Sequence, residues 1–150
     1  MSSDVFIVGA ARTPVGSFQG VLASQNAPQL GAHAIAAAIS QAGVDASAID
    51  EVIMGNVVSA GLKQAPARQA MRQAELPDSC GATTINKVCG SGMKATMLAT
   101  DLIRAGSAAT VVAGGMESMS NAPFLVDKAR TGLRMGHAHM LDALFTDGLE

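Results

Sequence analysis

The chain has 150 residues, of which 49% are hydrophobic and 15% charged, a composition typical of a folded domain and not of a disordered segment. Ten Lys and Arg residues against twelve Asp and Glu give a formal charge of −2, which excludes a general attraction to nucleic-acid phosphates or anionic lipid. The longest apolar run is Ala34–Ile39. A membrane-spanning helix needs about 18 such residues, so we expect a soluble protein that binds neither nucleic acid nor membrane.

The start of the chain and its cysteines bear on the compartment. The first basic residue is Arg12, so no basic segment precedes an apolar one in the manner of a targeting sequence. Cys80 and Cys89 are too few for a disulfide framework, and we expect them to be free thiols in a reducing compartment. These features predict a cytoplasmic chain.

Strand and helix patterns alternate along most of the chain. Short apolar runs predict strands, and segments with apolar residues spaced by about 3.6 positions, bounded by Pro or Gly, predict helices. In chain order the predicted elements are a strand at Val5–Val8, a helix at Pro28–Ala42, a strand at Ile49–Val58, a helix at Pro66–Ala74, a strand at Ala82–Val88, a helix at Gly92–Ala105 and a strand at Thr110–Ala113. This alternation is the signature of a layered α/β domain.

The pattern changes after Gly115. Ser118–Arg134 has no clear period and contains Pro123, so we expect it to be mainly irregular. An apolar pattern then begins at Met140–Phe145 and reaches Glu150 without a closing element. This ending predicts that the chain is part of a longer one.

The segment Asn86–Ala95 carries the most distinctive chemistry. It places Cys89 in a turn between a predicted strand and a predicted helix. At a helix N-terminus the helix dipole and the free backbone N–H groups favour the thiolate, which is the nucleophilic form of Cys. Gly90 and Gly92 leave space for a bulky substrate and permit unusual backbone angles, and N–H groups of the turn can stabilise an oxyanion. The segment therefore predicts a nucleophilic cysteine.

The spacing alone leaves alternatives open. A cysteine in a tight turn can equally be a small buried hydrophobic residue, because free Cys is often buried. Ser91 is a rival nucleophile, but Ser is inert without a neighbouring base, so we interpret it as a turn residue. Cys80 follows Pro77 in a predicted loop and is expected to be a structural or solvent-exposed thiol. Lys87 and Lys94 are expected to be solvated charges.

The histidines do not suggest a metal site. His33 lies at the boundary of a predicted helix face, where a histidine is ordinary. His137 and His139 would share a face if their segment were extended, but no third ligand accompanies them. We therefore expect no metal.

The Cys89 segment resembles the active-site segment of thiolases, in their biosynthetic type that forms acetoacetyl-CoA. Other stretches that resemble the family are Ala10–Gly16, Glu51–Val57, Gln64–Ala70 and Val112–Pro123. Degradative thiolases usually have Ser where this chain has Gly90, which favours the biosynthetic type. The resemblance extends over essentially all 150 residues.

The resemblance implies an α/β fold with αβαβα layers, of which this chain is the N-terminal βαβαβ half. Residues 1–118 would form the α/β domain that carries the nucleophilic Cys. Residues 119–150 would begin the loop domain, which covers the CoA pocket and helps to form a homotetramer, a dimer of dimers. The basic residues of this loop, Lys128, Arg130 and Arg134, would meet CoA phosphate, another subunit or only solvent, so no CoA-binding residue is assigned.

The resemblance also implies an acyltransferase. Two acetyl-CoA would give acetoacetyl-CoA and CoA in a reversible Claisen condensation through an acetyl group on Cys89. Acetyl-CoA, acetoacetyl-CoA and CoA are then the partners, and no cofactor beyond these thioester substrates is implied. In the family the base is a second Cys, a His activates the nucleophile and an Asn holds a water. These groups lie outside this stretch, so the 150-residue chain alone is expected to be inactive.

Two other hypotheses remain. A decarboxylating condensing enzyme of the wider superfamily also carries a Cys at this place, and dependence on a malonyl thioester would reveal it. A catalytically incomplete interaction module would retain the surface but lack the base. An intact mass near 15.1 kDa would support that second hypothesis.

Overall fold

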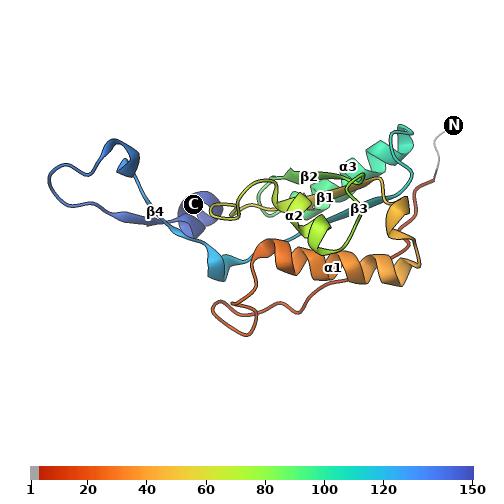
Figure 1. The fold of residues 1–150 in the computed structure, drawn as a ribbon, viewed down its shortest axis with the longest axis horizontal. Helices are drawn as coiled ribbons and strands as arrows, with labels where there is room; N and C mark the ends of the chain where they lie inside the picture. Colours follow the sequence, from red (N-terminus) through yellow and green to blue (C-terminus); the bar gives the residue numbers. More distant parts are fainter. Residues whose placement is uncertain (1–3) are drawn as a thin grey trace.

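A parallel sheet of three strands lies at the centre of the computed structural model, which describes residues 4–150 (Figure 1). The strands are β1 (Glu51–Gly55), β2 (Gly81–Ile85) and β3 (Val111–Gly115), in the order β2-β1-β3. Glu51 lies opposite Gly81 on one side and Val111 on the other. Because all three strands run in the same direction, their carboxyl ends meet at one edge, where ligands bind in sheets of this kind.

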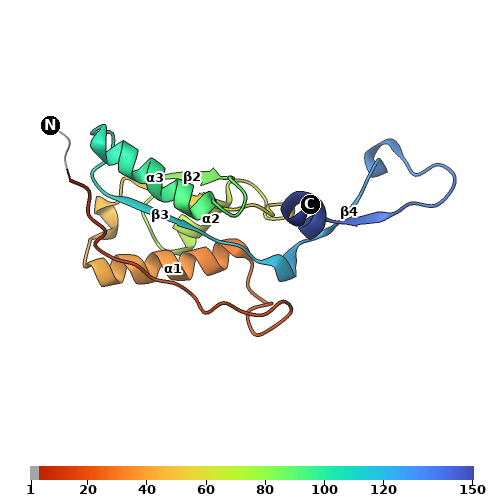
Figure 2. The same cartoon turned by 180° about the vertical axis from the view of Figure 1, so that it is seen from behind.

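Helices cover both faces of the sheet. α1 (Ala27–Ala42) and α2 (Pro66–Gln73) pack together on one face, and α3 (Ser91–Arg104) covers the other (Figures 1 and 2). α2 connects β1 to β2 and α3 connects β2 to β3, since parallel strands need a crossover connection. These elements confirm the three helices and three strands predicted between residues 28 and 113.

The ends of α1 follow from its sequence. Asn26 Oδ1 accepts a hydrogen bond from the Gln29 N–H at 3.0 Å, and Gln29 Oε1 accepts one from the Asn26 N–H at 2.8 Å. This reciprocal capping box satisfies backbone donors that the first helical turn leaves free. At the other end Gly43 adopts the left-handed conformation, with φ 65°, and its N–H reaches back to Ile39 and Ser40. Glycine takes this conformation without steric strain.

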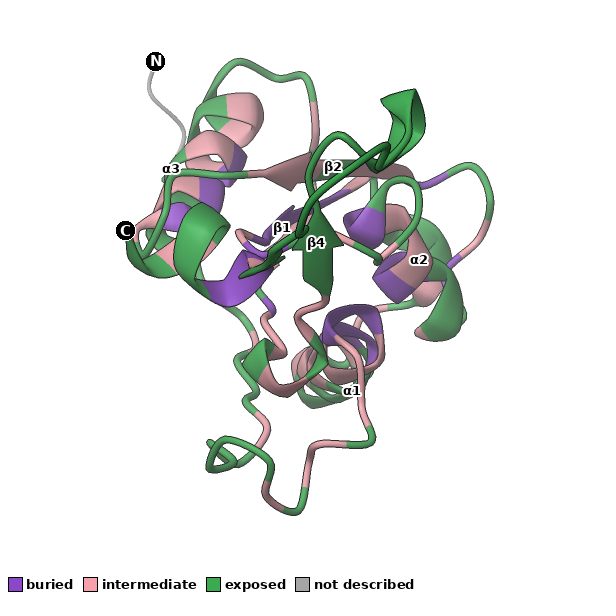
Figure 3. Cartoon of the chain, turned by 90° about the vertical axis from the view of Figure 1, so that its left-hand side faces the viewer, coloured by how far each residue is buried: buried purple, intermediate pink, exposed green. Residues whose placement is uncertain are grey.

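The core lies between the sheet and the layer formed by α1 and α2. Figure 3 shows buried segments on these elements. The core cluster comprises Ala27, Ile35, Ile49, Val52, Met54, Ala67, Ala70, Met71, Leu76, Cys80 and Met116. Most of these side chains are small or unbranched, which permits the close approach of the two layers.

The strand predicted at Val5–Val8 is wrong. The segment is extended but pairs with no strand among the described residues, and Phe6 and Ile7 are 76% and 82% exposed. It is attached to α1, because the Ala10 N–H donates to Gln41 Oε1 at 2.9 Å. A cavity of about 380 Å³ lies between this segment, α1, α3 and β3. An apolar pattern indicates a need for burial, whereas a strand also requires a hydrogen-bonded neighbour.

The last part of the chain forms a projecting arm. β4 (Phe124–Val126) pairs with β5 (Met140–Asp142) in an antiparallel hairpin, and every residue from 124 to 141 is exposed (Figures 1 and 3). The sequence predicts that the stretch Ser118–Arg134 is mainly irregular. The structure confirms this, except for β4 and two short 3₁₀ helices. Short 3₁₀ helices cover Ala46–Ala48, Met119–Asn121 and Ala129–Thr131, and a π-helix covers Phe145–Leu149. Within residues 4–150, no helix has the length and apolar character needed to cross a membrane.

Candidate active site

Cys89 lies in the turn that leads from β2 into α3, at the carboxyl edge of the sheet. Its side chain is exposed, so the alternative interpretation of Cys89 as a buried hydrophobic residue is wrong. α3 begins two residues later, with Gly90 as its N-cap. The first turn of a helix leaves backbone N–H groups without partners inside the helix, and these groups favour negative charge nearby.

Ser91 stabilises the turn through hydrogen bonds to its backbone. It is 5% exposed, and its Oγ accepts a hydrogen bond from the Lys87 N–H at 2.7 Å and donates one to the Val88 carbonyl at 2.6 Å. The hydroxyl is therefore engaged with the backbone on both sides of Val88. This geometry confirms the interpretation of Ser91 as a turn residue.

Backbone strain is concentrated at Val88, the residue before Cys89. Its φ of 49° lies in the left-handed region, which is a rare conformation for a β-branched residue. Strain of this kind costs about 1–3 kcal/mol and persists where the surroundings enforce it. Here the Val88 N–H donates to Asn86 Oδ1 at 2.9 Å, and its carbonyl accepts from Ser91. Two side chains thus hold the backbone in the conformation that exposes Cys89.

The prediction that the glycines of the turn use unusual backbone angles is wrong for Gly90. Gly90 has φ −88°, so it does not use the angles that only glycine adopts easily. A Cβ at Gly92 would lie 3.7 Å from the Gly115 nitrogen, so this glycine lies against the end of β3. A glycine outside the turn also matters here: at Gly55, at the end of β1, a Cβ would lie 2.5 Å from Ser91 Cβ. Only glycine at position 55 allows the start of α3 to rest directly on the sheet.

Asn56 and Glu117 also belong to this edge of the sheet, and sequence reasoning did not single them out. Asn56 directly follows β1 and is 2% exposed, and Glu117 follows β3 by two residues. The Glu117 carboxylate accepts hydrogen bonds from Asn56 Nδ2 at 2.8 Å, the Val57 N–H at 2.9 Å and the Val58 N–H at 3.3 Å. Burial raises the pKa of Glu117, and the two backbone donors partly oppose this effect.

The amide of Asn56 is only partly satisfied. Nδ2 also donates to the Met116 carbonyl at 3.2 Å, whereas the buried Oδ1 has no hydrogen-bond partner among residues 4–150. A buried acceptor without a partner costs about 1–3 kcal/mol. A polar residue directly after a strand at the ligand-binding edge is the signal that would have drawn attention to Asn56.

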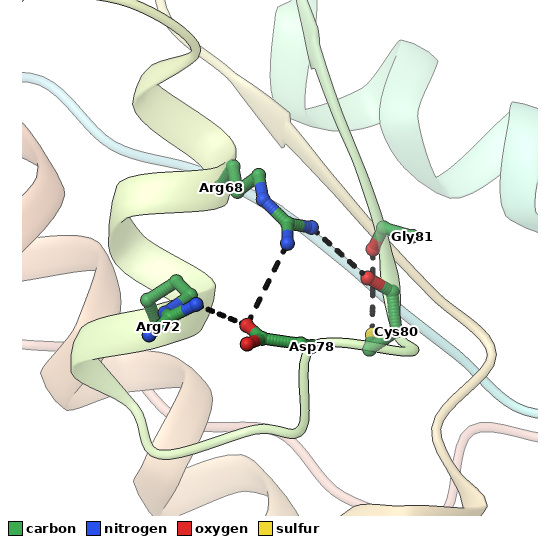
Figure 4. Close-up of polar contacts among 5 residues, drawn as sticks. All are labelled: Arg68, Arg72, Asp78, Cys80 and Gly81. Atoms are coloured by element: carbon green, nitrogen blue, oxygen red, sulfur yellow. Dashed lines mark hydrogen bonds and ion pairs between the residues drawn. The ribbon is translucent and has the colours of Figure 1, made fainter.

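Cys80 is a structural thiol. It is 2% exposed in the core, and its Sγ lies 3.3 Å from the Gly81 carbonyl oxygen, so the solvent-exposed alternative is wrong. Burial raises the pKa of the Cys80 thiol, the nearby Glu51 and Asp50 raise it further, and Arg68 opposes the shift. Two arginines of α2 bind the segment from Asp78 to Cys80 (Figure 4). Arg68 donates to the Cys80 carbonyl at 3.4 Å, and both Arg68 and Arg72 pair with Asp78.

The remaining candidates lie away from the Cys89 turn or face solvent. Lys87 is exposed, as predicted for a solvated charge, and Lys94 is partly buried. His33 is exposed on α1, and the two other histidines and the basic residues of the loop are exposed on the arm. No group of three potential metal ligands occurs among residues 4–150.

The fold and the Cys89 turn together define an α/β protein that presents a side chain on a strand-to-helix turn. Within that class the chain belongs to the thiolase family, because residues 5–150 match the model described as "Thiolase, N-terminal domain". The chain is 56% identical over 146 residues to "Acetyl-CoA acetyltransferase" from Pseudomonas aeruginosa, covering 97% of this chain and 37% of the relative. It is 55% identical over 147 residues to the protein of the same name from Cupriavidus necator, covering 98% and 37%.

A solved structure agrees with this membership. The crystal structure of Acat5 thiolase from Ascaris suum in complex with coenzyme A matches with a TM-score of 0.93 and 45% identity, over 97% of this chain and 38% of that chain. The match confirms the expected fold class. The chain therefore spans little more than a third of the length of the relatives it matches.

Proposed function

We propose that the protein containing this chain is an acetyl-CoA acetyltransferase, which reversibly condenses two acetyl-CoA to acetoacetyl-CoA and CoA. The exposed Cys89 on a strained turn at the start of α3 is the observation that carries the proposal. The relatives with that name and the Ascaris thiolase in complex with coenzyme A support the choice of substrate.

In the proposed reaction the Cys89 thiolate attacks the carbonyl carbon of acetyl-CoA. The bond between that carbon and the CoA sulfur breaks, and CoA leaves after its sulfur takes up a proton. A second acetyl-CoA then loses a proton from its methyl group, and the resulting carbanion attacks the acetyl group on Cys89. Acetoacetyl-CoA forms, and the Cys89 thiolate is released. The positive end of the α3 dipole lies next to Cys89 and is suited to stabilise the oxyanion formed in each attack.

The proposed reaction needs groups beyond these 150 residues. The base, the activating His and the water-holding Asn that the resemblance implies lie elsewhere in the family, and the chain matches only 37% of its relatives' length. We therefore assign this chain to the N-terminal part of a longer protein, with residues 1–118 as the α/β domain and residues 119–150 as the start of a loop domain. The reaction uses thioester substrates and calls for no separate cofactor.

The proposal extends to assembly and compartment. The arm from Phe124 to Leu141 is exposed and carries apolar side chains, including Met135 and Met140, which suits a contact between subunits of a homotetramer. The free thiols Cys80 and Cys89 suit the reducing environment of the cytoplasm.

Two matched variants of the full-length protein test the proposal. Cys89→Ser should lower the turnover of acetyl-CoA by about 1,000-fold or more, because the hydroxyl forms an alkoxide far less readily than a thiol forms a thiolate. Cys80→Ser, which changes the buried thiol, should leave turnover largely intact. Near-normal turnover by Cys89→Ser would contradict the proposal. Condensation that requires a malonyl thioester would instead support the decarboxylating hypothesis.

A further inference from the structure

Asn56 connects the carboxyl ends of all three strands. It follows β1, its N–H donates to the carbonyl of Ile85 at the end of β2 at 3.0 Å, and its Nδ2 donates to the carbonyl of Met116 just after β3 at 3.2 Å. Asn56 is also almost fully buried, so water does not compete for these hydrogen bonds. Its position fixes the three strand ends relative to one another.

Glu117 fixes the backbone that follows Asn56. Its carboxylate accepts hydrogen bonds from Asn56 Nδ2 and from the N–H groups of Val57 and Val58, at distances from 2.8 to 3.3 Å. Three donors converge on one half-buried carboxylate. Hydrogen bonds to a charged group are stronger than those between neutral groups, so this carboxylate restrains the loop after β1.

The restrained backbone supports the Cys89 turn. Gly55 precedes Asn56, and a Cβ at Gly55 would lie 2.5 Å from Ser91 Cβ, so the two backbones are in direct contact. Ser91 in turn holds the carbonyl of Val88, the residue before Cys89, at 2.6 Å. Because protein interiors are close-packed, a shift of the loop after β1 displaces this turn as well.

We infer that Glu117 and Asn56 are positioning residues, which set the place of the Cys89 thiol above the sheet edge without touching the substrate. The inference rests on the proposed function for its kinetic consequence. A mutation far from the reacting atoms that misplaces them by about 1 Å can reduce a rate by about 100-fold.

Asp50 provides a matched control at the opposite end of the sheet. It precedes β1, and its Oδ2 accepts hydrogen bonds from the N–H groups of Ala109 and Thr110 at 2.7 and 3.0 Å, just before β3. Like Glu117, Asp50 is a carboxylate that joins the β1 and β3 segments through backbone donors, although Asp50 is exposed and Glu117 is half-buried. The amino ends of the strands lie away from the Cys89 turn. A change at Asp50 should therefore lower the stability of the fold without displacing Cys89.

The test compares Glu117→Gln with Asp50→Asn in the full-length protein. Both variants replace a carboxylate by a neutral amide, which weakens the hydrogen bonds from the backbone N–H donors, and both should lower the melting temperature. At Glu117 both carboxylate oxygens accept hydrogen bonds, so the Gln must also place its NH₂ group against at least one donor. Only Glu117→Gln should lower kcat, by about 100-fold, with KM for acetyl-CoA little changed. Glu117→Asp keeps the carboxylate and should recover part of the loss. The rate at which iodoacetamide alkylates Cys89 should fall only in Glu117→Gln.

Equal kcat values in Glu117→Gln and Asp50→Asn would overturn the inference. If Glu117→Gln does not fold, Asn56→Ala makes the same comparison, with a fall in kcat supporting the inference and an unchanged kcat overturning it. If the unaltered protein transfers no acetyl group, the proposed function fails by itself. The alkylation rate then still decides the inference, because a rate in Glu117→Gln equal to that of the unaltered protein contradicts positioning.

Discussion

In the Cys89 turn, the residue with the strained backbone lies next to the residues whose hydrogen bonds stabilise it. Val88 takes the unfavourable backbone angle, and Ser91 and Asn86 supply the hydrogen bonds that maintain it. Cys89 itself is left exposed. The residue that carries the proposed chemistry is therefore accessible to a substrate, while the backbone strain that exposes it lies at the neighbouring Val88.

Gly55→Ala should disrupt the contact between the end of β1 and the start of α3, on which the Cys89 turn rests. The new methyl group would lie 2.5 Å from Ser91 Cβ, so α3 or the end of β1 must move. We expect a loss of about 1–3 kcal/mol in the free energy of unfolding, measured by urea denaturation, together with a large fall in acetyl-CoA turnover.

Gly114→Ala is the control for this change. Its nearest neighbour is the flexible Met54 side chain, with Sδ 3.4 Å from the added Cβ, so the strain should be smaller and turnover should be largely retained. Full turnover by Gly55→Ala would contradict the role given to that glycine.

At the residue scale, local pattern explains what the sequence predicted. Cys89 and Ser91 lie within one strand–turn–helix segment, so the exposure of one and the hydrogen bonds of the other follow from neighbouring residues. The pair of Asn56 and Glu117 joins residues 61 positions apart, and nothing in either local sequence indicates the other. Gly55 was missed for the same reason, since its requirement comes from a helix far along the chain.

Elements were predictable where their ends carry local signals. α1 has Pro28 and Gly43 at its boundaries, and α2 begins at Pro66, so these helices follow from sequence alone. Val5–Val8 has the composition of a strand but lies beside a cavity and not beside a paired strand. Pairing depends on distant parts of a chain, which composition does not reveal.

The junction of β1 with β3 should make the stability depend on pH. Hydrogen bonds from the N–H groups of Thr110 and Ala109 lower the pKa of Asp50. A carboxyl group whose pKa is lower in the folded state stabilises the fold above its unfolded pKa, and that contribution disappears as the pH falls through the folded pKa. The difference in melting temperature between the unaltered protein and Asp50→Asn should therefore be full near neutral pH and shrink below the ordinary pKa of 3.8. A difference that stays constant into strong acid would contradict this assignment.

The whole molecule exposes much apolar surface. Phe6, Ile7, Val15, Val21 and Met135 are between 76% and 99% exposed, and within residues 4–150 the strands β2 and β3 each have one open edge. Large exposed apolar surfaces and open strand edges mark contacts with other chains or segments. This surface agrees with a chain that covers only 37% of its relatives' length.

The 150-residue chain alone should therefore associate. We expect aggregation or partial unfolding at micromolar concentration, measured by analytical ultracentrifugation and a thermal melt followed by circular dichroism. The full-length protein should instead give a defined oligomer. A monomeric 150-residue chain with a sharp cooperative melt would contradict this prediction, because the fold would then be stable with its apolar surface exposed to solvent.

The most direct test of the account is to find the acetyl group after the full-length protein has reacted with acetyl-CoA and been quenched in acid. Trypsin cleaves after Arg72, Lys87 and Lys94, which separates Cys80 and Cys89 into different peptides for tandem mass spectrometry. We expect an acetyl group on Cys89 in the peptide of residues 88–94, and none on Cys80 in the peptide of residues 73–87. Acetylation of another residue, or turnover without any acetyl group on Cys89, would contradict it.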